Sequence, residues 1–520
     1  MAVLAAGGNA FDAAVAVSAA LAVVEPYSSG IGGGGFWLLH IASEGRDLMV
    51  DGRERAPLAA SRTLYLDDSG QFVPEASLNG PLAAGIPGEP AALAHIAETY
   101  GRLPLADSLA PAIRLAREGF PVDPVYRRMA QWRLDVLRAS PAAATQFLHD
   151  GEVPEVGARI HQPDLAAVLE ALAEDGRDGF YAGPVAEALV AGTRAAGGIW
   201  TLEDLADYRV VERDPIVGEY QGWRIVSASP PSSGGVALVQ MLNMLGALTT
   251  RLGPAASDAD CAHRLVEAMR RAYRDRARYL GDPDHVAIPV ALLTHPFYAS
   301  GLARDIDPAR ATPSRLVVPE PEGEDTTHFS ILDADGNRVA ATLSINYPFG
   351  SGFVPPGTGV LLNDEMDDFS AQPGVPNAYG LIGGEANAIA PGKRMLSSMS
   401  PTFVTSEHSV VILGTPGGSR IITMVLHGIL AAIAGGDPAE WVALPRFHHQ
   451  YLPDEVEFEP GAFDPAVQAE LERRGHALKP RERPFGNMQL IAWDRANGVV
   501  RAISDPRGIG AAEVRVPSSR

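Results

Sequence analysis

The order of hydrophobic and polar residues predicts strands and helices that follow one another along the chain. Short apolar runs predict strands at 36–41, 224–228, 410–413 and 489–493. Longer apolar or amphipathic runs predict helices at 13–24, 90–100, 111–118, 165–174, 261–279 and 421–434. We find no internal repeat, low-complexity tract or clear linker between them. The pattern therefore indicates either two or three domains or one large layered domain.

One pair of neighbouring strands allows its register to be derived. Apolar and polar residues alternate at 328–332 and again at 339–346 after a short turn. A slip of one residue would move every side chain to the other face of the sheet. Phe329 and Ile331 must therefore share a face with the apolar residues of the returning strand. This requirement predicts the odd loop 334–336, in which the glycine has a positive φ.

The same register predicts a face of polar side chains on this hairpin. It places Ser344 opposite Thr326 and Thr342 opposite His328, with Ser330 and Asn346 on the same face. Pattern alone also allows an ordinary half-exposed hairpin whose hydroxyl groups lie in water. Only further motifs distinguish a reactive face from a solvated one.

Thr326 stands at the first position of the first strand, directly after the acidic, proline-containing segment 317–325. Such segments are usually surface connectors, but this one is also the best candidate for a cleavable loop. A break between Asp325 and Thr326 would leave a free amine beside the threonine hydroxyl. One residue would then supply both nucleophile and base.

Composition narrows the classes of partner and chemistry. The 520-residue chain is 46% hydrophobic with 54 glycines and 42 prolines, which is typical of a turn-rich globular protein. A net charge of −21 argues against nucleic acid as a partner, because phosphate binding requires a basic face. The single cysteine, Cys261, excludes internal disulfides and a cysteine-based zinc site. We expect Cys261 to be a buried structural thiol.

The sequence predicts no interaction with a membrane. Its early apolar run at 13–24 is shorter than the roughly 20 residues that a spanning helix needs. No basic region precedes that run and no cleavage-site pattern follows it, so it is not a signal peptide. As it stands the sequence indicates the cytoplasm; a missing N-terminal signal would instead indicate the periplasm or secretion.

Several motifs, in order, resemble those of the γ-glutamyltranspeptidase (glutathione hydrolase) family over essentially the whole chain. The matching stretches are Gly7–Ala14, Gly32–Phe36, Arg53–Pro57, Pro230–Gly235, Thr326–Ser330, Asn363–Ser370, Leu396–Pro401, Gly414–Arg420 and Arg446–Gln450. The resemblance implies an α+β, four-layer αββα sandwich of the N-terminal-nucleophile hydrolase type. It also implies a precursor that cuts itself into a large subunit, 1–325, and a small subunit, 326–520. The two subunits would stay associated as a heterodimer in one intertwined domain.

The resemblance also assigns catalytic roles. Thr326 would attack the γ-carbonyl of glutathione or a related compound, and water or an amine acceptor would then take the glutamyl group. Ser344 matches the position that hydrogen-bonds the nucleophile, where the family commonly has threonine. Gly417 and Gly418 match the oxyanion hole, and adjacent glycines at a strand-to-helix turn suit that role. A plain turn is the alternative, whereas a phosphate loop lacks its Gly-Lys-Ser/Thr.

Substrate recognition would need both signs of charge. The family pattern assigns Arg53, Ser397 and Ser398 to the α-carboxylate of the glutamyl group and Asn346, Glu365 and Asp368 to its ammonium group, and puts Tyr379 at the tip of a lid loop. Without that context, 53–55 would be surface charge and 365–368 a solvated acidic turn. The lid loop could equally be a rigid surface loop.

Neither a metal nor another cofactor is expected. His448 and His449 are consecutive, so on a strand they would point to opposite faces, and we interpret them as structural. Two other functions remain open: an acylase for glutaryl-type amides on the same fold, and an uncleaved binding protein. Asp368 argues against the first, because a glutaryl group has no ammonium. Intact Thr326, Ser344 and both glycines, Gly417 and Gly418, argue against the second.

Overall fold

Two antiparallel sheets form the centre of the molecule. The structure is a computed structural model that describes residues 1–314, 326–372, 374–377 and 380–516. The first sheet has the order β5 (Val211–Arg213), β2 (Arg46–Gly52), β1 (Gly34–Ile41), β9 (Arg338–Ser344) and β8 (Thr327–Leu332). The second has the order β16 (Val499–Ser504), β15 (Gln489–Asp494), β11 (Ser409–Gly414), β10 (Thr402–Thr405), β7 (Trp223–Ser227) and β6 (Ile216–Tyr220).

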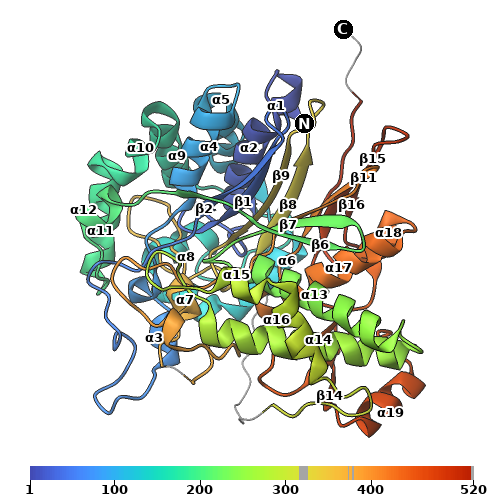
Figure 1. Ribbon diagram of the computed structural model, residues 1–520. Coiled ribbons are helices and arrows are strands. Elements are labelled where there is room, and N and C mark those ends of the chain that lie inside the picture. The colour runs from blue at the N-terminus through green and yellow to red at the C-terminus, as the bar shows by residue number, and fades with distance from the viewer. Residues whose placement is uncertain (315–325, 373, 378–379, 517–520) are drawn as a thin grey trace.

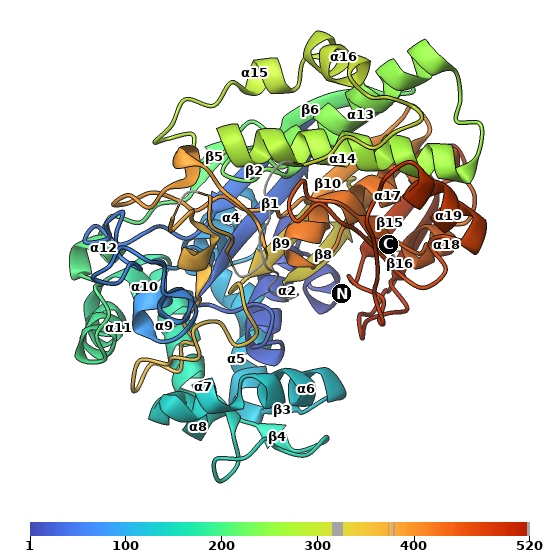
Figure 2. The ribbon, with the colours of Figure 1, turned by 90° about the horizontal axis from the view of Figure 1, so that it is seen from below.

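Helices cover the outer face of each sheet. On the first sheet pack α2 (Ala10–Val24) and α4 (Glu89–Tyr100), with α5 (Leu105–Glu118) against α2 and α9 (Pro163–Asp175) against α5. On the second pack α13 (Gly234–Leu252) and α17 (Ile421–Ala434), with α14 (Asp258–Tyr279) against α13. Figures 1 and 2 show the two groups of helices on opposite sides of the strands. The inner faces pack through a third cluster that includes Phe36, Leu38, Val226 and Ile412. The predicted αββα sandwich is therefore confirmed.

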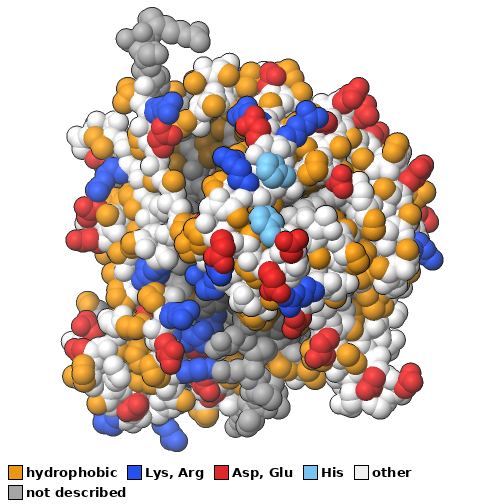
Figure 3. Space-filling model, turned by 180° about the vertical axis from the view of Figure 1, so that it is seen from behind, with side chains coloured by type: hydrophobic (Ala, Val, Ile, Leu, Met, Phe, Trp, Pro, Cys, Tyr) orange, Lys and Arg blue, Asp and Glu red, His pale blue; other side chains and the backbone are white. Residues whose placement is uncertain are grey.

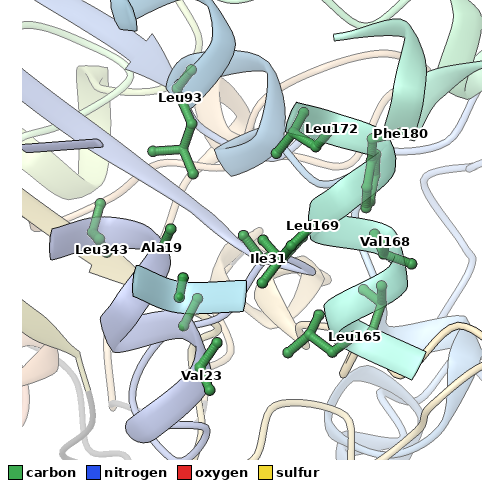
Figure 4. Close-up of a cluster of buried hydrophobic side chains, with 14 of the residues drawn as sticks. Ala19, Val23, Ile31, Leu93, Leu165, Val168, Leu169, Leu172, Phe180 and Leu343 are labelled. Carbon is green, nitrogen blue, oxygen red and sulfur yellow. The ribbon is translucent and has the colours of Figure 1, made fainter. Parts of the chain in front are cut away.

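Burial of apolar side chains explains how the outer layer is held. In Figure 4, Ala19 and Val23 of α2 lie near Leu343 of β9 and Ile31, while Leu169 of α9 points toward the same region. These side chains are at most 4% exposed. Each large aliphatic side chain removed from water in this way contributes roughly 1.5–3 kcal/mol. Strand β9 of the hairpin is therefore held in place by buried apolar side chains on the face opposite its polar one.

The first sequence motif forms the N-terminal cap of α2. The Asn9 side chain accepts hydrogen bonds from the backbone N–H groups of Phe11 and Asp12, and the Asp12 carboxylate accepts the N–H of Asn9. This reciprocal arrangement satisfies N–H groups that the helix itself leaves unpaired. Asp12 also accepts hydrogen bonds from the backbone N–H groups of Arg102 and Leu103, so it joins α2 to the connection between α4 and α5. This part of the motif is structural.

The derived hairpin register is confirmed. His328 pairs with Thr342 and Thr327 with Leu343, which places Ser344 opposite Thr326. Gly336 has a φ of 89° in the turn. The alternative of a half-exposed hairpin is wrong, because the polar face points into the sandwich and Thr342 and His328 are buried. A side chain at position 414 on β11 would collide with the His328 ring, so the two sheets approach closely there.

The predicted strands and most predicted helices are confirmed within a few residues, but two expectations are wrong. Helix α5 begins at Leu105 and contains Pro111, which we expected to start the helix. Leu105, Leu109 and Ala112 are buried along one face of the helix. This packing allows the helix to begin before Pro111, the position at which the sequence predicted its start. Cys261 is exposed rather than buried, because it lies on the outer side of α14.

Further helices and strands surround this framework in the described residues. They are α1 (Ala2–Ala5), α3 (Pro74–Leu78), β3 (Phe120–Pro121), α6 (Pro124–Trp132), α7 (Leu134–Ala139), α8 (Pro141–Phe147), β4 (Arg159–Ile160), α10 (Asp178–Tyr181), α11 (Gly183–Ala195), α12 (Leu202–Ala206), α15 (Val290–Leu293), α16 (Pro296–Arg304), α18 (Pro438–Ala443), β12 (Phe447–His448), β13 (Val456–Phe458), α19 (Pro465–Arg473) and β14 (Leu478–Pro480). The 3-10 turns are η1 (Pro81–Ala83), η2 (Glu365–Asp368), η3 (Glu385–Asn387) and η4 (Gly418–Arg420).

The surface mixes charged, polar and apolar side chains. On the face in Figure 3, acidic and basic side chains lie among hydrophobic ones. None of the helices in the described part of the chain combines the length and the apolar character that crossing a bilayer requires.

Candidate active site

One pocket brings together most of the residues that the sequence motifs singled out. It encloses about 290 Å³ of space, including its open mouth. Its lining comprises Arg53, Thr326, Ser344, Asn346, Glu365, Asp368, Leu381, Ser397, Ser398, Met399, Gly418, Ser419 and Ile421. Gly417 precedes the lining residue Gly418, whereas Asp325 and Tyr379 lie outside the described residues. Segments far apart in the sequence therefore converge on a single cavity.

Hydroxyl groups form one end of this pocket. Thr326 directly precedes β8 and is 7% exposed. Ser344 lies opposite it at the end of β9, and its Oγ accepts the N–H of Asn346 at 2.8 Å. The neighbouring Thr327 points to the other face, where its hydroxyl donates to Glu25 Oε2 at 3.1 Å. The start of β8 is thus anchored from behind while Thr326 lines the pocket.

The glycine-rich turn after β11 lies at the same end. Gly417 and Gly418 have φ values of 135° and 53°, and the chain then enters η4 and α17. The φ of Gly417 lies in a region that other residues rarely adopt, so this backbone favours glycine. Backbone N–H groups at the beginning of a helix favour negative charge. The turn can therefore stabilise an oxyanion, which remains a predicted role.

Ionisable groups form the other end of the pocket. The Arg53 guanidinium is fully buried and donates from Nη1 to Glu365 Oε2 and from Nη2 to Asp368 Oδ2, both at 2.5 Å. Its Nε donates to the carbonyl of Met395 at 3.2 Å. The alternatives of surface charge at 53–55 and a solvated turn at 365–368 are wrong for these three side chains. They form a buried network at the pocket wall.

Burial perturbs the carboxyl groups of this network. Burial raises the pKa of Glu365 to about 7, and Asp368 adds to the rise, while Arg53 and a hydrogen bond from Ser344 oppose it. Burial likewise raises the pKa of Asp368, against the attraction of Arg53. Glu54, fully buried behind Arg53, has its pKa raised well above the usual value, mainly by burial and by Glu365. Perturbed groups of this kind in a pocket are typical of a functional site.

Asn346 hydrogen-bonds both to Ser344 at the hydroxyl end and to Asp364, the residue before Glu365. It has a φ of 74°, and its side-chain amide donates to the carbonyl of Asp364 at 3.0 Å. Asparagine adopts a positive φ more readily than most other residues do. Its N–H bond to Ser344 fixes this conformation next to the hydroxyl end.

The serine pair at 397–398 is held by a residue that the sequence motifs did not include. Arg276 of α14 donates to Ser398 Oγ at 3.2 Å and to Ser233 Oγ at 3.0 Å. Ser233 Oγ in turn donates to the carbonyl of Ser397 at 2.7 Å. Arg276 is only 5% exposed on a helix that carries many arginines. Its position on the buried face of the amphipathic pattern was the only available signal.

The two adjacent histidines lie away from this pocket. A ring nitrogen of His448 is 2.8 Å from Thr423 Oγ1, and a ring nitrogen of His449 is 3.2 Å from Asp454. Both rings are buried. In the described residues, no group of three or more histidine, cysteine or acidic side chains is arranged to hold a metal ion.

An αββα sandwich with a buried threonine directly before a strand of one of its two central sheets defines the class of N-terminal-nucleophile hydrolases. The family model described as Gamma-glutamyltranspeptidase matches residues 1–515, and the chain belongs to this family. A glutathione hydrolase proenzyme from Escherichia coli (strain K12) is 44% identical over 510 residues, covering 97% of this chain and 87% of that protein.

Solved structures agree with this membership. The crystal structure of a cephalosporin acylase from Bacillus halodurans has a TM-score of 0.85 and 30% identity, over 99% of this chain and 92% of that chain. A γ-glutamyltranspeptidase from Helicobacter pylori has a TM-score of 0.58 and 41% identity, over 61% of this chain and 90% of that chain. The family's fold therefore covers essentially the whole molecule.

Proposed function

We propose that this protein is a γ-glutamyltranspeptidase and glutathione hydrolase that cuts its own chain before Thr326. The observation that carries the proposal is the pocket, which has a strand-heading threonine at one end and a guanidinium between two carboxylates at the other. A γ-glutamyl group has a carbonyl at one end and a zwitterionic head at the other. The pocket thus complements the substrate at both ends.

Self-cleavage would produce a large subunit of residues 1–325 and a small subunit of residues 326–520 that remain together. The proenzyme name of the Escherichia coli relative supports such processing. The shared sheet supports the association, because β9 of the small subunit pairs with β1 of the large one. The new amine of Thr326 would then serve as the base for its own hydroxyl.

Acyl transfer would proceed in two steps. Thr326 Oγ attacks the γ-carbonyl carbon, its proton passes to the Thr326 amine, and the N–H groups of Gly417 and Gly418 stabilise the oxyanion. The amide bond breaks as the leaving amine takes that proton, which leaves an acyl ester on Thr326. Water or the amine of an amino acid or peptide then attacks the ester and restores the hydroxyl. Ser344 would orient Thr326 Oγ through a hydrogen bond.

Recognition of the glutamyl head would use the charged end. Arg53, Ser397 and Ser398 would bind the α-carboxylate, since a guanidinium fork suits a carboxylate. Asn346, Glu365 and Asp368 would accept hydrogen bonds from the ammonium group. Tyr379 would cover the pocket and shield the acyl ester from water. No cofactor is needed for these steps.

A glutaryl-type amide acylase is the second candidate. The similarity to the cephalosporin acylase favours it, because the fold is shared over nearly the whole chain. Against it stand Glu365 and Asp368, both at the pocket wall, since a glutaryl group brings no ammonium to pair with them. A glutaryl group would leave both carboxylates without the cationic partner that an ammonium provides.

Two measurements test the proposal. Mass spectrometry and a denaturing gel of the purified protein should show two fragments, the smaller beginning at Thr326. Release of p-nitroaniline should be faster from the γ-glutamyl anilide than from the glutaryl anilide. A single full-length band after long incubation would contradict an enzyme of this kind, and faster glutaryl turnover would favour the acylase.

A further inference from the structure

Arg276 is a buried cation without a carboxylate partner in the described part of the chain. It is 5% exposed, its hydrogen bonds go to two serine hydroxyls, and it forms no salt bridge with any described residue. Burying a charged side chain without an ion pair lowers the stability of the folded protein. Its neighbour Arg270 on the same helix is paired with Glu267 and Asp454. The difference indicates that the charge of Arg276 serves the adjacent pocket.

The hydrogen-bond directions define what Arg276 does there. The guanidinium has only N–H donors, so Ser398 Oγ accepts its bond and keeps its own O–H free to donate. Ser398 lines the pocket, where that O–H can meet an anion. The second branch, through Ser233 Oγ, fixes the carbonyl of Ser397. One guanidinium thus orients both members of the serine pair.

Charge balance gives a second reason. Arg53 carries one positive charge and faces Glu54, Glu365 and Asp368. Burial raises the pKa of Glu54 well above its usual value, so with Glu54 protonated and the other two acids ionised this end of the pocket has a net charge of −1. Arg276 lies close enough to interact electrostatically with Asp368 and Arg53. Its charge brings the end to neutrality. An entering carboxylate would otherwise be repelled.

We propose that Arg276 is a positioning residue for the α-carboxylate of the γ-glutamyl donor. It directs the Ser398 hydroxyl at that carboxylate and provides a second positive charge behind it. This inference deepens the proposed function and rests on its placement of the glutamyl head. Arg276 belongs to the proposed large subunit and Ser398 to the small one, so the two pieces build this part of the pocket together.

The test compares three ligands by isothermal titration calorimetry on the mature protein. L-Glutamate carries the α-carboxylate and the ammonium, glutarate lacks the ammonium, and 4-aminobutyrate lacks the α-carboxylate. Arg276→Gln should raise the Kd of L-glutamate and of glutarate by about 10-fold, as expected for a lost charged hydrogen bond. The Kd of 4-aminobutyrate should not rise. Equal weakening of all three ligands, or no weakening, would overturn the proposal.

Two variants guard this comparison. Arg274→Gln changes an arginine on the same helix whose side chain is 46% exposed, and it should leave all three Kd values unchanged. Arg276→Lys keeps the charge but not the two-branched geometry, so it should weaken L-glutamate and glutarate less than Arg276→Gln does. It carries the test if the glutamine variant does not fold. If only the Arg276→Lys variant folds and it keeps the full native affinity, the orienting role of Arg276 would be contradicted.

A double-mutant cycle tests the route through Ser398. If Arg276 acts through that hydroxyl, Arg276→Gln should weaken L-glutamate less in a Ser398→Ala background than in the native protein. Additive losses would show that the two residues act independently. Because binding is measured rather than turnover, a protein that binds L-glutamate in this way but fails to cleave γ-glutamyl anilides would contradict the proposed function and not this inference.

Discussion

The two ends of the pocket are built from different materials. The end with Thr326 and Ser344 contains hydroxyl groups and backbone N–H groups, whereas the end with Arg53, Glu365 and Asp368 contains buried ions. Neutral groups suit a place where charge develops only during the reaction. Charged side chains suit a ligand head that is charged throughout. The contrast suggests that chemistry and recognition can be disturbed separately, and mutations can test this.

The largest expected effect is at the neutral end. Thr326→Ala removes the nucleophile and should abolish self-cleavage and reduce turnover by about 10⁴-fold or more, as for other catalytic nucleophiles. A denaturing gel and an anilide assay measure both. Thr326→Ser keeps a hydroxyl and should still yield two fragments. An alanine variant that is still cut would mean that another bond is the scissile one.

The second effect concerns the charged end. Asp368→Asn removes a buried charge that we expect to contact the ammonium, so kcat/KM for the γ-glutamyl anilide should fall about 100-fold. The glutaryl anilide has no ammonium and should lose far less. Glu385→Gln, at an acid whose side chain is 70% exposed, serves as a control and should change neither value. Equal losses for both anilides would show that Asp368 does not recognise the ammonium.

The third effect appears as a pH dependence of binding. Because burial raises the pKa of Glu365 to about 7, its ionised form increases as the pH rises from 6 to 8. An ammonium ligand needs that ionised form, so the Kd of L-glutamate should fall about 10-fold over this range. Glu365→Gln cannot titrate and should flatten the profile. A glutamine variant with the native pH dependence would assign the titration to another group.

The smallest expected effect is at Ser344, a residue of the hydroxyl end that also bonds to the charged end of the pocket. Ser344→Ala removes a hydrogen bond predicted to orient the nucleophile, and kcat should fall about 5-fold, the value of one ordinary hydrogen bond. Ser344→Thr keeps the hydroxyl and should stay near the native rate. Ser344 also bonds Glu365, so a change mainly in KM would mean that its bond to the charged end matters more.

The sequence was most informative where structure is local. Strand alternation and a short turn determine the hairpin register, so the placement of Ser344 opposite Thr326 followed from about 20 residues. The charged end was predicted only through family motifs. Arg53 and Glu365 lie 312 positions apart, and no local pattern shows that they form an ion pair.

The predictions that were wrong or missing concern features that depend on contacts between distant parts of the chain. Pro111 lies within α5 because buried contacts along the helix outweigh a local preference for a helix start. Cys261 is exposed, and the side of a long amphipathic helix on which one residue lies could not be fixed from composition. Arg276 was not predicted because α14 carries several buried arginines, and only the fold shows which of them lacks a carboxylate partner among the described residues.

The ladder between β1 and β9 carries an implication for expression of the protein. Seven residue pairs, from Gly34 with Ser344 to His40 with Arg338, join strands encoded on either side of the codon for Thr326. Two separate genes divided at that codon would each encode an incomplete sheet with a long apolar edge, which is prone to aggregate. A continuous coding sequence lets the central strands meet before any cut is made.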